Sequence, residues 1–260
     1  MRLACDDFTQ GLRQYRLWLH LGWMELLQRY RRSLLGPWWL TISMLLFISM
    51  MSLVFSQLFQ ESLDEYVPFF TAGYLFWTFI SNTLIESGDI FKSNSPFIKQ
   101  SRLPYNLYIF KHLVRQSICL LHNSAVYLLV CLYFQKNPGL TSLLAIPGFL
   151  LLLANLYWVC LLSAMVSTRY RDMIPMIAAC MQIAFFTTPV SWMPRLLNTH
   201  SAWLRFNPFV YFLDLVRSPL LGAAPSLSSW LVCGVLALIG SSLTLALFSA
   251  LRPRIVFWVD

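Results

Sequence analysis

The sequence predicts an all-α integral membrane protein, and three observations support this fold class. Hydrophobic residues make up 58% of the 260 positions. Charged residues make up only 12%, against about 25% in typical soluble domains. The apolar residues gather in six segments, each close to the roughly 20 residues that a helix needs to cross a bilayer. Little sequence remains for a soluble catalytic domain, so we expect one membrane domain over residues 1–260.

The N-terminal region predicts an amphipathic interface helix over residues 8–30. Apolar and aromatic side chains recur there at steps of three and four positions, and basic side chains form an adjacent stripe. Such a helix lies along a membrane surface rather than across it. The region carries charges throughout and has no small-residue cleavage site, so we do not expect a removable signal peptide.

Six transmembrane helices are predicted after this segment. Pro189 falls inside the fifth, where we expect a kink. The stretch 203–215 is too short to span a bilayer and too apolar to be fully wet. It predicts re-entrant helices on the outer side, between the fifth and sixth spans, broken near Asn207 and Pro208. The predicted spans are 34–59, 67–85, 113–134, 140–167, 174–192 and 227–251.

The distribution of positive charge predicts that both termini are cytoplasmic. The net charge is +8, and fourteen lysines and arginines fall in the N-terminal region, in 86–112, in 168–173 and in the tail. The opposite loops hold four. Positive loops stay in the cytoplasm. Topology and lipid phosphate therefore explain the basic clusters, and nucleic acid is not an expected partner.

Sequence motifs for catalysis and for ATP hydrolysis are missing. There is no G-x-x-x-x-G-K-[ST] phosphate loop, so the chain cannot hydrolyse ATP by that route. All acidic residues are expected outside the spans, which disfavours a secondary transporter driven by protons or sodium. The six cysteines show no Cys-x-x-Cys spacing and predict neither a disulfide nor a metal site. We expect no catalytic residue, metal or cofactor in this chain.

Three arginines, Arg29, Arg31 and Arg32, precede the first span in QRYRRSLLGPWW. Two interpretations are open, and they are compatible. The arginines can anchor the chain by binding lipid phosphates. They can also receive an anionic headgroup such as a pyrophosphate, for which bidentate guanidinium groups are well shaped.

Arg115 and His122 lie seven positions apart on one face of the third predicted span. Arg115 can extend to the cytoplasmic surface or line a polar conduit. His122 has no second ligand-type residue nearby, and we expect a packed, hydrogen-bonded histidine rather than a metal ligand or proton relay. Trp38 and Trp39 fit either an aromatic belt at the membrane boundary or a ladder of rings along a channel.

Several stretches together resemble the permease subunit of ABC exporters that move lipid-linked polysaccharides, such as O-antigen, capsule or teichoic acid, across the bacterial inner membrane. The resemblance covers nearly the whole chain, and the order and spacing of the stretches make it specific. They are RYRRSLLGPWW, FTAGYLFWTFISN, SPFIKQSRLPYNLYIF, TRYRDMIPM with TTPVSWMP, and RFNPFVYFLDLVRSPLLG.

The resemblance implies an assembly of two copies of this chain with two ATPase subunits, which bind ATP and Mg²⁺. It implies a coupling helix over 95–106 that presses into the ATPase, a second ATPase contact at 168–173, and outer-side gate helices over 195–218. The implied ATPase-coupling residues are Pro96, Phe97, Lys99, Arg102 and Pro104. The implied channel or gate residues are Trp38, Trp39, Arg115, Asn207, Pro208, Phe209, Asp214 and Arg217.

The function that this resemblance implies is export of O-antigen on polyprenyl pyrophosphate from the cytoplasm to the periplasm. Capsular polysaccharide or teichoic acid is an alternative cargo. A different class, a membrane-embedded enzyme acting on polyprenyl-linked sugars, would need clustered carboxylates or a nucleophile–base pair, and the sequence shows only scattered acids. A channel without a motor would not need the basic loop at 92–111. Six helices can hardly enclose a tunnel for a hydrated glycan, which favours a homodimer.

Overall fold

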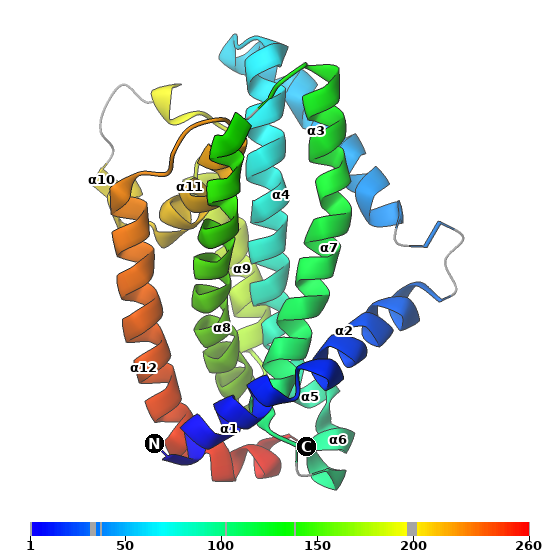
Figure 1. Ribbon diagram of the computed structural model, residues 1–260, viewed down its shortest axis with the longest axis vertical. Coiled ribbons are helices and arrows are strands. Elements are labelled where there is room, and N and C mark those ends of the chain that lie inside the picture. Colours follow the sequence, from blue (N-terminus) through cyan, green and yellow to red (C-terminus); the bar gives the residue numbers. More distant parts are fainter. Residues whose placement is uncertain are drawn as a thin grey trace.

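The structure, a computed structural model, describes residues 2–31, 35–36, 38–101, 103–137, 139–196 and 202–259, and all regular structure among them is helical (Figure 1). The predicted all-α fold is confirmed. Two 3₁₀ helices cover Gly139–Leu144 and Pro194–Leu196. The α-helices are α1 (Arg2–Arg13), α2 (Tyr15–Tyr30), α3 (Trp38–Phe59), α4 (Leu63–Ser87), α5 (Ile90–Ser93), α6 (Ser95–Gln100), α7 (Tyr105–Tyr133), α8 (Ala145–Arg169), α9 (Met173–Thr187), α10 (Ala202–Phe206), α11 (Pro208–Leu220) and α12 (Leu227–Trp258).

Four segments among the described residues are long and apolar enough to cross a membrane: α3, α7, α8 with its preceding 3₁₀ turn, and α12. Helix α4 has 25 residues but is less apolar, and α9 is apolar but has only 15 residues. A helix of 15 residues is about 22 Å long, short of the roughly 30 Å of hydrocarbon. The chain is therefore a multi-pass membrane protein, and the count of six spans stays a prediction.

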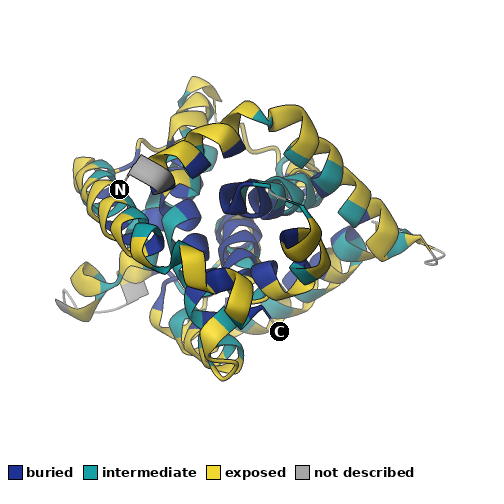
Figure 2. Cartoon of the chain, turned by 90° about the horizontal axis from the view of Figure 1, so that it is seen from below, coloured by how far each residue is buried: buried dark blue, intermediate teal, exposed yellow. Residues whose placement is uncertain are grey.

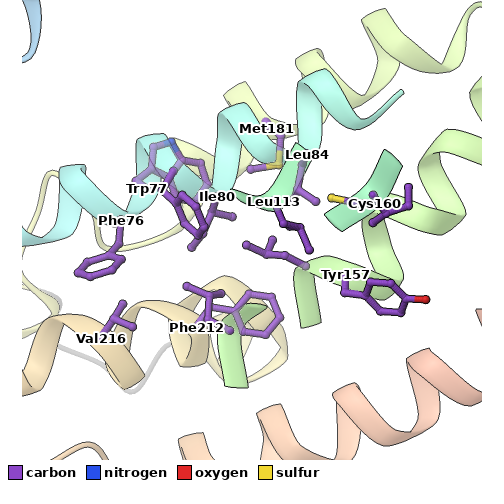
Figure 3. Packing of buried hydrophobic residues seen from close by; sticks show 14 of the residues in the cluster. Phe76, Trp77, Ile80, Leu84, Leu113, Tyr157, Cys160, Met181, Phe212 and Val216 are labelled. Atoms are coloured by element: carbon purple, nitrogen blue, oxygen red, sulfur yellow. The ribbon is translucent and has the colours of Figure 1, made fainter. Parts of the chain in front are cut away.

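Helix α4 lies at the centre of the bundle. It packs against α3, α7, α8, α9 and α11, and 14 of its residues are buried. Figure 3 shows Phe76, Trp77 and Ile80 of α4 on the side that faces Phe212 and Val216 of α11. Seen from below, buried residues occupy the middle of the bundle and exposed ones its rim (Figure 2). The interior of one chain is thus filled by side chains of α4 and its neighbours.

The N-terminal segment forms two helices, which corrects the single helix predicted over 8–30. The backbone leaves the helical region at Gln14, with φ −85° and ψ 36°, and α1 already begins at Arg2. Together α1 and α2 cross one end of the bundle and pack against α7 (Figure 1). Gly22 permits this close approach, because a Cβ there would lie 3.1 Å from the Lys111 carbonyl oxygen.

The predicted apolar stripe on α1 and α2 mostly points away from the bundle. Leu12, Leu19 and Trp23 are exposed, whereas Gly22 and Leu26 are buried against other helices. Gly22 and Leu26 of α2 thus face the protein, while Leu19 and Trp23 of the same helix are left for the surroundings. This division fits a helix that rests on a membrane surface.

Two predicted spans end at least five residues away from the predicted boundary. The fifth was expected to reach 192, but α9 stops at Thr187, two residues before Pro189, since a residue next to a proline is disfavoured in a helix. The sixth was expected to end at 251, but α12 continues to Trp258 through Pro253. Figure 1 shows α12 bending toward its end, and the two ends of the chain lie at the same end of the bundle.

Candidate functional site

Six charged side chains line one cavity of about 850 Å³ at the end of the bundle that α1 and α2 cross. The cavity lies between α2, α4, α5, α7 and the start of α9. Its charges balance, since three are basic and three are acidic. They are Arg29, Lys111, Arg115, Glu25, Glu86 and Asp89.

Arg115 of α7 is the centre of this charged cluster. Its guanidinium donates to Glu25 Oε1 of α2 at 2.7 Å and also binds the carboxylate of Glu86 in α4. Only 11% of the Arg115 side chain is exposed, so it does not extend to the surface, and that interpretation is wrong. Removing a charge from water costs several kcal/mol, and the two carboxylates offset this cost. Arg115 therefore ties three helices together while it lines the cavity.

Glu25 is held in its charged form. The ammonium of Lys111, one turn before Arg115, forms an ion pair of 2.8 Å with Glu25 Oε2. Burial acts to raise the pKa of Glu25, but the hydrogen bond from Lys111 and the charges of Arg115 and Lys111 outweigh burial. The pKa of Glu25 therefore lies below its ordinary value of 4.5.

The arginines predicted to receive a headgroup lie at the edge of this cavity or beyond it. Arg29 lines the cavity, and its guanidinium lies 3.2 Å from Glu86 Oε1 with 53% of the side chain exposed. Arg31 is exposed at the end of α2. Arg32 lies outside the described residues. The structure thus brings Arg29 and Arg115 to the same carboxylate, which the sequence did not indicate.

The predicted coupling helix over 95–106 is shorter in the structure. Helix α6 ends at Gln100, and α7 begins at Tyr105, so Asn106 belongs to α7. Pro104 is extended, with φ −63° and ψ 138°, and cannot continue α6. Arg102 lies outside the described residues.

Helix α6 presents an uncovered side at the end of the bundle (Figure 1). Phe97 is 58% exposed, and Pro96 and Lys99 are also exposed. Ile98 and Pro104 are buried and hold the segment to the rest of the chain.

A buried carboxylate that the sequence did not single out lies beside this segment. Asp7 of α1 accepts hydrogen bonds from the backbone N–H groups of Tyr105 and Asn106, at 3.3 and 3.0 Å, which are the first two residues of α7. It also accepts from Arg252 Nε of α12 at 3.0 Å. Tyr157 of α8 completes the junction by donating to Asn106 Oδ1 at 2.5 Å. A carboxylate at a helix N-terminus satisfies free N–H groups and the helix dipole.

At the opposite end of the bundle, Asn207 confirms the predicted helix break. It ends α10 and caps α11, where its Oδ1 accepts from Phe209 N at 3.0 Å. Its Nδ2 donates to Thr188 Oγ1 at 2.9 Å and so holds the end of α9. Pro208 is exposed at the first position of α11, and the Phe209 ring lies 5.6 Å from that of Trp77 in α4. Helix α11 runs to Leu220, beyond the predicted boundary at 218, and residues 197–201 lie outside the described residues.

Arg217 and Asp214 of α11 each hold a neighbouring loop. Arg217 is buried, donates to the Pro189 carbonyl at 2.5 Å, and stacks 4.4 Å from the Phe69 ring centre. Asp214 accepts from the backbone and side chain of Ser226, which begins α12. Both predicted gate residues therefore secure connections between helices.

The predicted channel tryptophans lie at the start of α3 on its exposed side. The Trp38 ring meets His122 edge to face at 4.9 Å, and Trp39 is also exposed. His122 packs as predicted, but its Nε2 has no hydrogen-bond partner among the described residues. In the part of the chain that the structure describes, no group of His, Cys, Asp or Glu side chains could hold a metal ion.

The charged cluster and the Asp7 junction could not be predicted from the sequence, because their members are distant from one another along the chain. Glu86 was assigned to a loop, but it lies in the last turn of α4. One signal was present: Lys111 and Arg115 are four positions apart, so they share a helix face and require carboxylates on a facing helix.

Together the bundle, its apolar helices and its charged end define a multi-pass membrane protein. Comparison with protein-family models matches residues 16–221 to the ABC-2 type transporter. The chain belongs to this family. The family resemblance seen in the sequence is confirmed, and family membership implies a transporter permease that works with an ATPase, not an enzyme.

A curated relative gives a more specific likeness. The chain is similar to the O-antigen export system permease protein RfbA of Klebsiella pneumoniae, with 21% identity over 188 residues. The aligned part covers 71% of this chain and 72% of the relative.

Proposed function

We propose that this chain is the membrane-spanning subunit of an ATP-driven exporter that moves lipid-linked polysaccharide from the cytoplasm to the periplasm. The cargo class is O-antigen on polyprenyl pyrophosphate. The observation that carries the proposal is the similarity to a permease named for O-antigen export, which extends over 71% of the chain.

In this proposal the chain crosses the bacterial inner membrane six times, with both ends in the cytoplasm. Helix α4 would be about 38 Å long at 1.5 Å per residue, and its neighbours shield its polar residues from lipid. The fifth crossing is α9 together with the buried stretch at 188–191. An even number of crossings agrees with the two ends of the chain lying together (Figure 1). The basic loops at that end support the cytoplasmic assignment.

The working unit in this proposal is a homodimer. Helix α4 fills the centre of the bundle, so one chain offers no path for a glycan along its own axis. A path between two copies avoids that packed core. Trp38 and Trp39, exposed at the start of α3, are proposed to line or flank this path.

Lipid pyrophosphate is proposed to enter beside Arg29, Arg31 and Arg32. Arg29 supports this role, because half of its side chain is exposed at the rim of the charged cavity. Glu86 already shares the Arg29 charge, so an incoming pyrophosphate must outcompete that carboxylate. A divalent anion can do so with bidentate hydrogen bonds.

The separate ATPase, which binds ATP and Mg²⁺, is proposed to dock on α6 through Pro96, Phe97 and Lys99, and to contact Arg102 in the segment that follows α6 in sequence. A second contact is the 168–173 loop, where Tyr170 is exposed. At the other end, α10 and α11 are proposed as re-entrant gate helices, with Asn207 as their hinge. Asp214 and Arg217 would hold the gate closed through the loops that they bind.

Reconstitution tests the proposal. The chain and its ATPase are placed in proteoliposomes with polyprenyl pyrophosphate-linked O-polysaccharide on one side. We expect ATP-dependent exposure of the glycan to a membrane-impermeant glycosidase on the other side, and none with an ATPase that lacks its phosphate-loop lysine. Glycan movement without an ATPase would contradict the proposal. Transport of capsular polysaccharide or teichoic acid, with no transport of O-antigen, would show that the cargo is one of those polymers instead.

A further inference from the structure

The last residues of α12 have one covered side and one uncovered side. Ile255 and Val259 are buried, whereas Phe257 is 77% exposed and Val256 is also exposed. Pro253 lies inside the helix, where it removes a backbone donor. Figure 1 shows the end of α12 turned beneath the bundle at the level of α6.

Two contacts fix this stretch beside both proposed ATPase contacts. Ser95 Oγ, at the start of α6, donates to the Val259 carbonyl at 2.8 Å. The Arg169 guanidinium, at the end of α8, lies 5.6 Å from the Trp258 ring centre. The end of α12 therefore touches α6 on one side and the 168–173 loop on the other.

The uncovered side suits a protein partner rather than lipid. Phe97 of α6 and Phe257 of α12 are both exposed. Figure 1 shows α6 and the end of α12 at the same end of the bundle. Arg169, whose guanidinium lies near the Trp258 ring, is exposed, and so are Arg171 of the 168–173 loop and Arg254 of α12. Aromatic side chains within a basic surround match an apolar groove with an acidic rim on a partner.

We propose that residues 254–259 are a third part of the ATPase docking surface, in which Phe257 enters the same partner subunit as Phe97. The inference rests on the proposed function, which supplies the ATPase and its contact at α6. It adds a segment far from the predicted coupling helix in sequence. The Ser95 and Arg169 contacts make the three parts one continuous surface.

Labelling of single cysteines tests this surface. F257C is introduced into the chain with its six native cysteines replaced by alanine, and the variant is placed in nanodiscs. A membrane-impermeant maleimide is added with and without the purified ATPase subunit of the same transporter. F97C reports the α6 contact, and F206C, at a phenylalanine 84% exposed at the opposite end, is the matched control.

The expected result is that the ATPase slows labelling of F257C and F97C by about tenfold or more, because central interface residues are sealed from water, and leaves F206C unchanged. Protection of F97C without protection of F257C would overturn the inference and leave the proposed function standing. If the ATPase protects neither F97C nor F257C, the proposed docking at α6 is contradicted as well. An F257C that resists labelling even without the ATPase would place Phe257 in lipid and overturn the inference.

A second measurement does not depend on cysteine chemistry. Co-expressed ATPase that purifies with the tagged chain is expected to fall about tenfold for F257D and to be unchanged for F206D. Phe257 contributes little to the core, so the substitution spares the fold. Full retention of the ATPase by F257D would overturn the inference.

Discussion

The Asp7 carboxylate and the Arg252 guanidinium form an ion pair of 3.0 Å across 245 positions of sequence. Because Asp7 also caps the first residues of α7, this pair joins α1, α7 and α12 directly beside the segment that leads out of α6. The interface helices are thereby fixed to the proposed ATPase end of the bundle by a charge that is fully buried.

Substituting Asp7→Asn is expected to destabilise the fold. The variant keeps the shape of the side chain but loses the charge that binds Arg252 and the dipole of α7. We expect a loss of about 2 kcal/mol or more, since a buried charged partner is removed. Unfolding by SDS in mixed micelles measures the change. Asp6→Asn, at the adjacent exposed position, is the control and should change stability by less than about 0.5 kcal/mol. Equal stability of the two variants would refute the role of Asp7.

Glu25→Gln is expected to have an effect that depends on pH. The pKa of Glu25 in the folded protein lies below 4.5, so the unfolded chain binds more protons near that pH. The stability that Glu25 contributes is therefore complete above pH 4.5 and is lost as the pH falls through the lower folded value. We expect a gap in Tm between the native chain and Glu25→Gln at pH 7 that closes on acidification toward pH 3. A gap that stays constant with pH would count against this ion pair.

Gly148→Ala is expected to disturb the packing of α8 on α11. A Cβ at Gly148 would lie 2.3 Å from the Leu215 carbonyl oxygen, a backbone atom that cannot rotate away. We expect a loss of about 1–3 kcal/mol, as for other overpacked sites. Gly234→Ala is the matched control, because nothing lies within 4 Å of its added Cβ. Alanine should stabilise that uncrowded site of α12 by up to about 1 kcal/mol. Tolerance of Gly148→Ala in the same unfolding assay would show that the helices lie further apart.

Arg217→Lys is expected to loosen the stretch at 188–193. Lysine keeps the charge but lacks the planar group that stacks on Phe69 while it reaches the Pro189 carbonyl. Hydrogen exchange of the amides in 188–193 should accelerate about tenfold, which corresponds to about 1.4 kcal/mol. Arg205→Lys, at an exposed position of α10, should leave exchange unchanged. Unchanged exchange in Arg217→Lys would show that other contacts hold the stretch.

Local features of the chain were predictable from the sequence. The all-α fold follows from the length and composition of apolar segments, and the break at Asn207 follows from the chemistry of an asparagine before a proline. The early end of α9 could also have been read from Pro189. The division of the interface helix at Gln14 has no such signal, because glutamine favours neither a break nor a cap.

Contacts between helices were not predictable. Arg115 finds Glu25 and Glu86 at separations of 90 and 29 positions, and those pairings depend on how α2 and α4 dock on α7. In the sequence, Asp7 is one charged residue on a predicted surface helix, and only the structure shows that it caps the start of α7. The side of α2 that faces the bundle was not predictable either, since the closest approach to α7 is at Gly22, whereas Leu19 and Trp23 of the predicted apolar stripe are exposed.

The central position of α4 has a consequence for biogenesis. A helix without an apolar stretch as long and as hydrophobic as those of α3, α7 and α8 is a weak substrate for partitioning from the translocon into lipid on its own. Helix α4 therefore depends for its stable insertion in the membrane on α3, which is translated before it, and on α7 and α8, which are translated after it. Ribosome-bound chains truncated before α7 should therefore leave α4 accessible to the aqueous channel, and longer chains should commit it to the membrane.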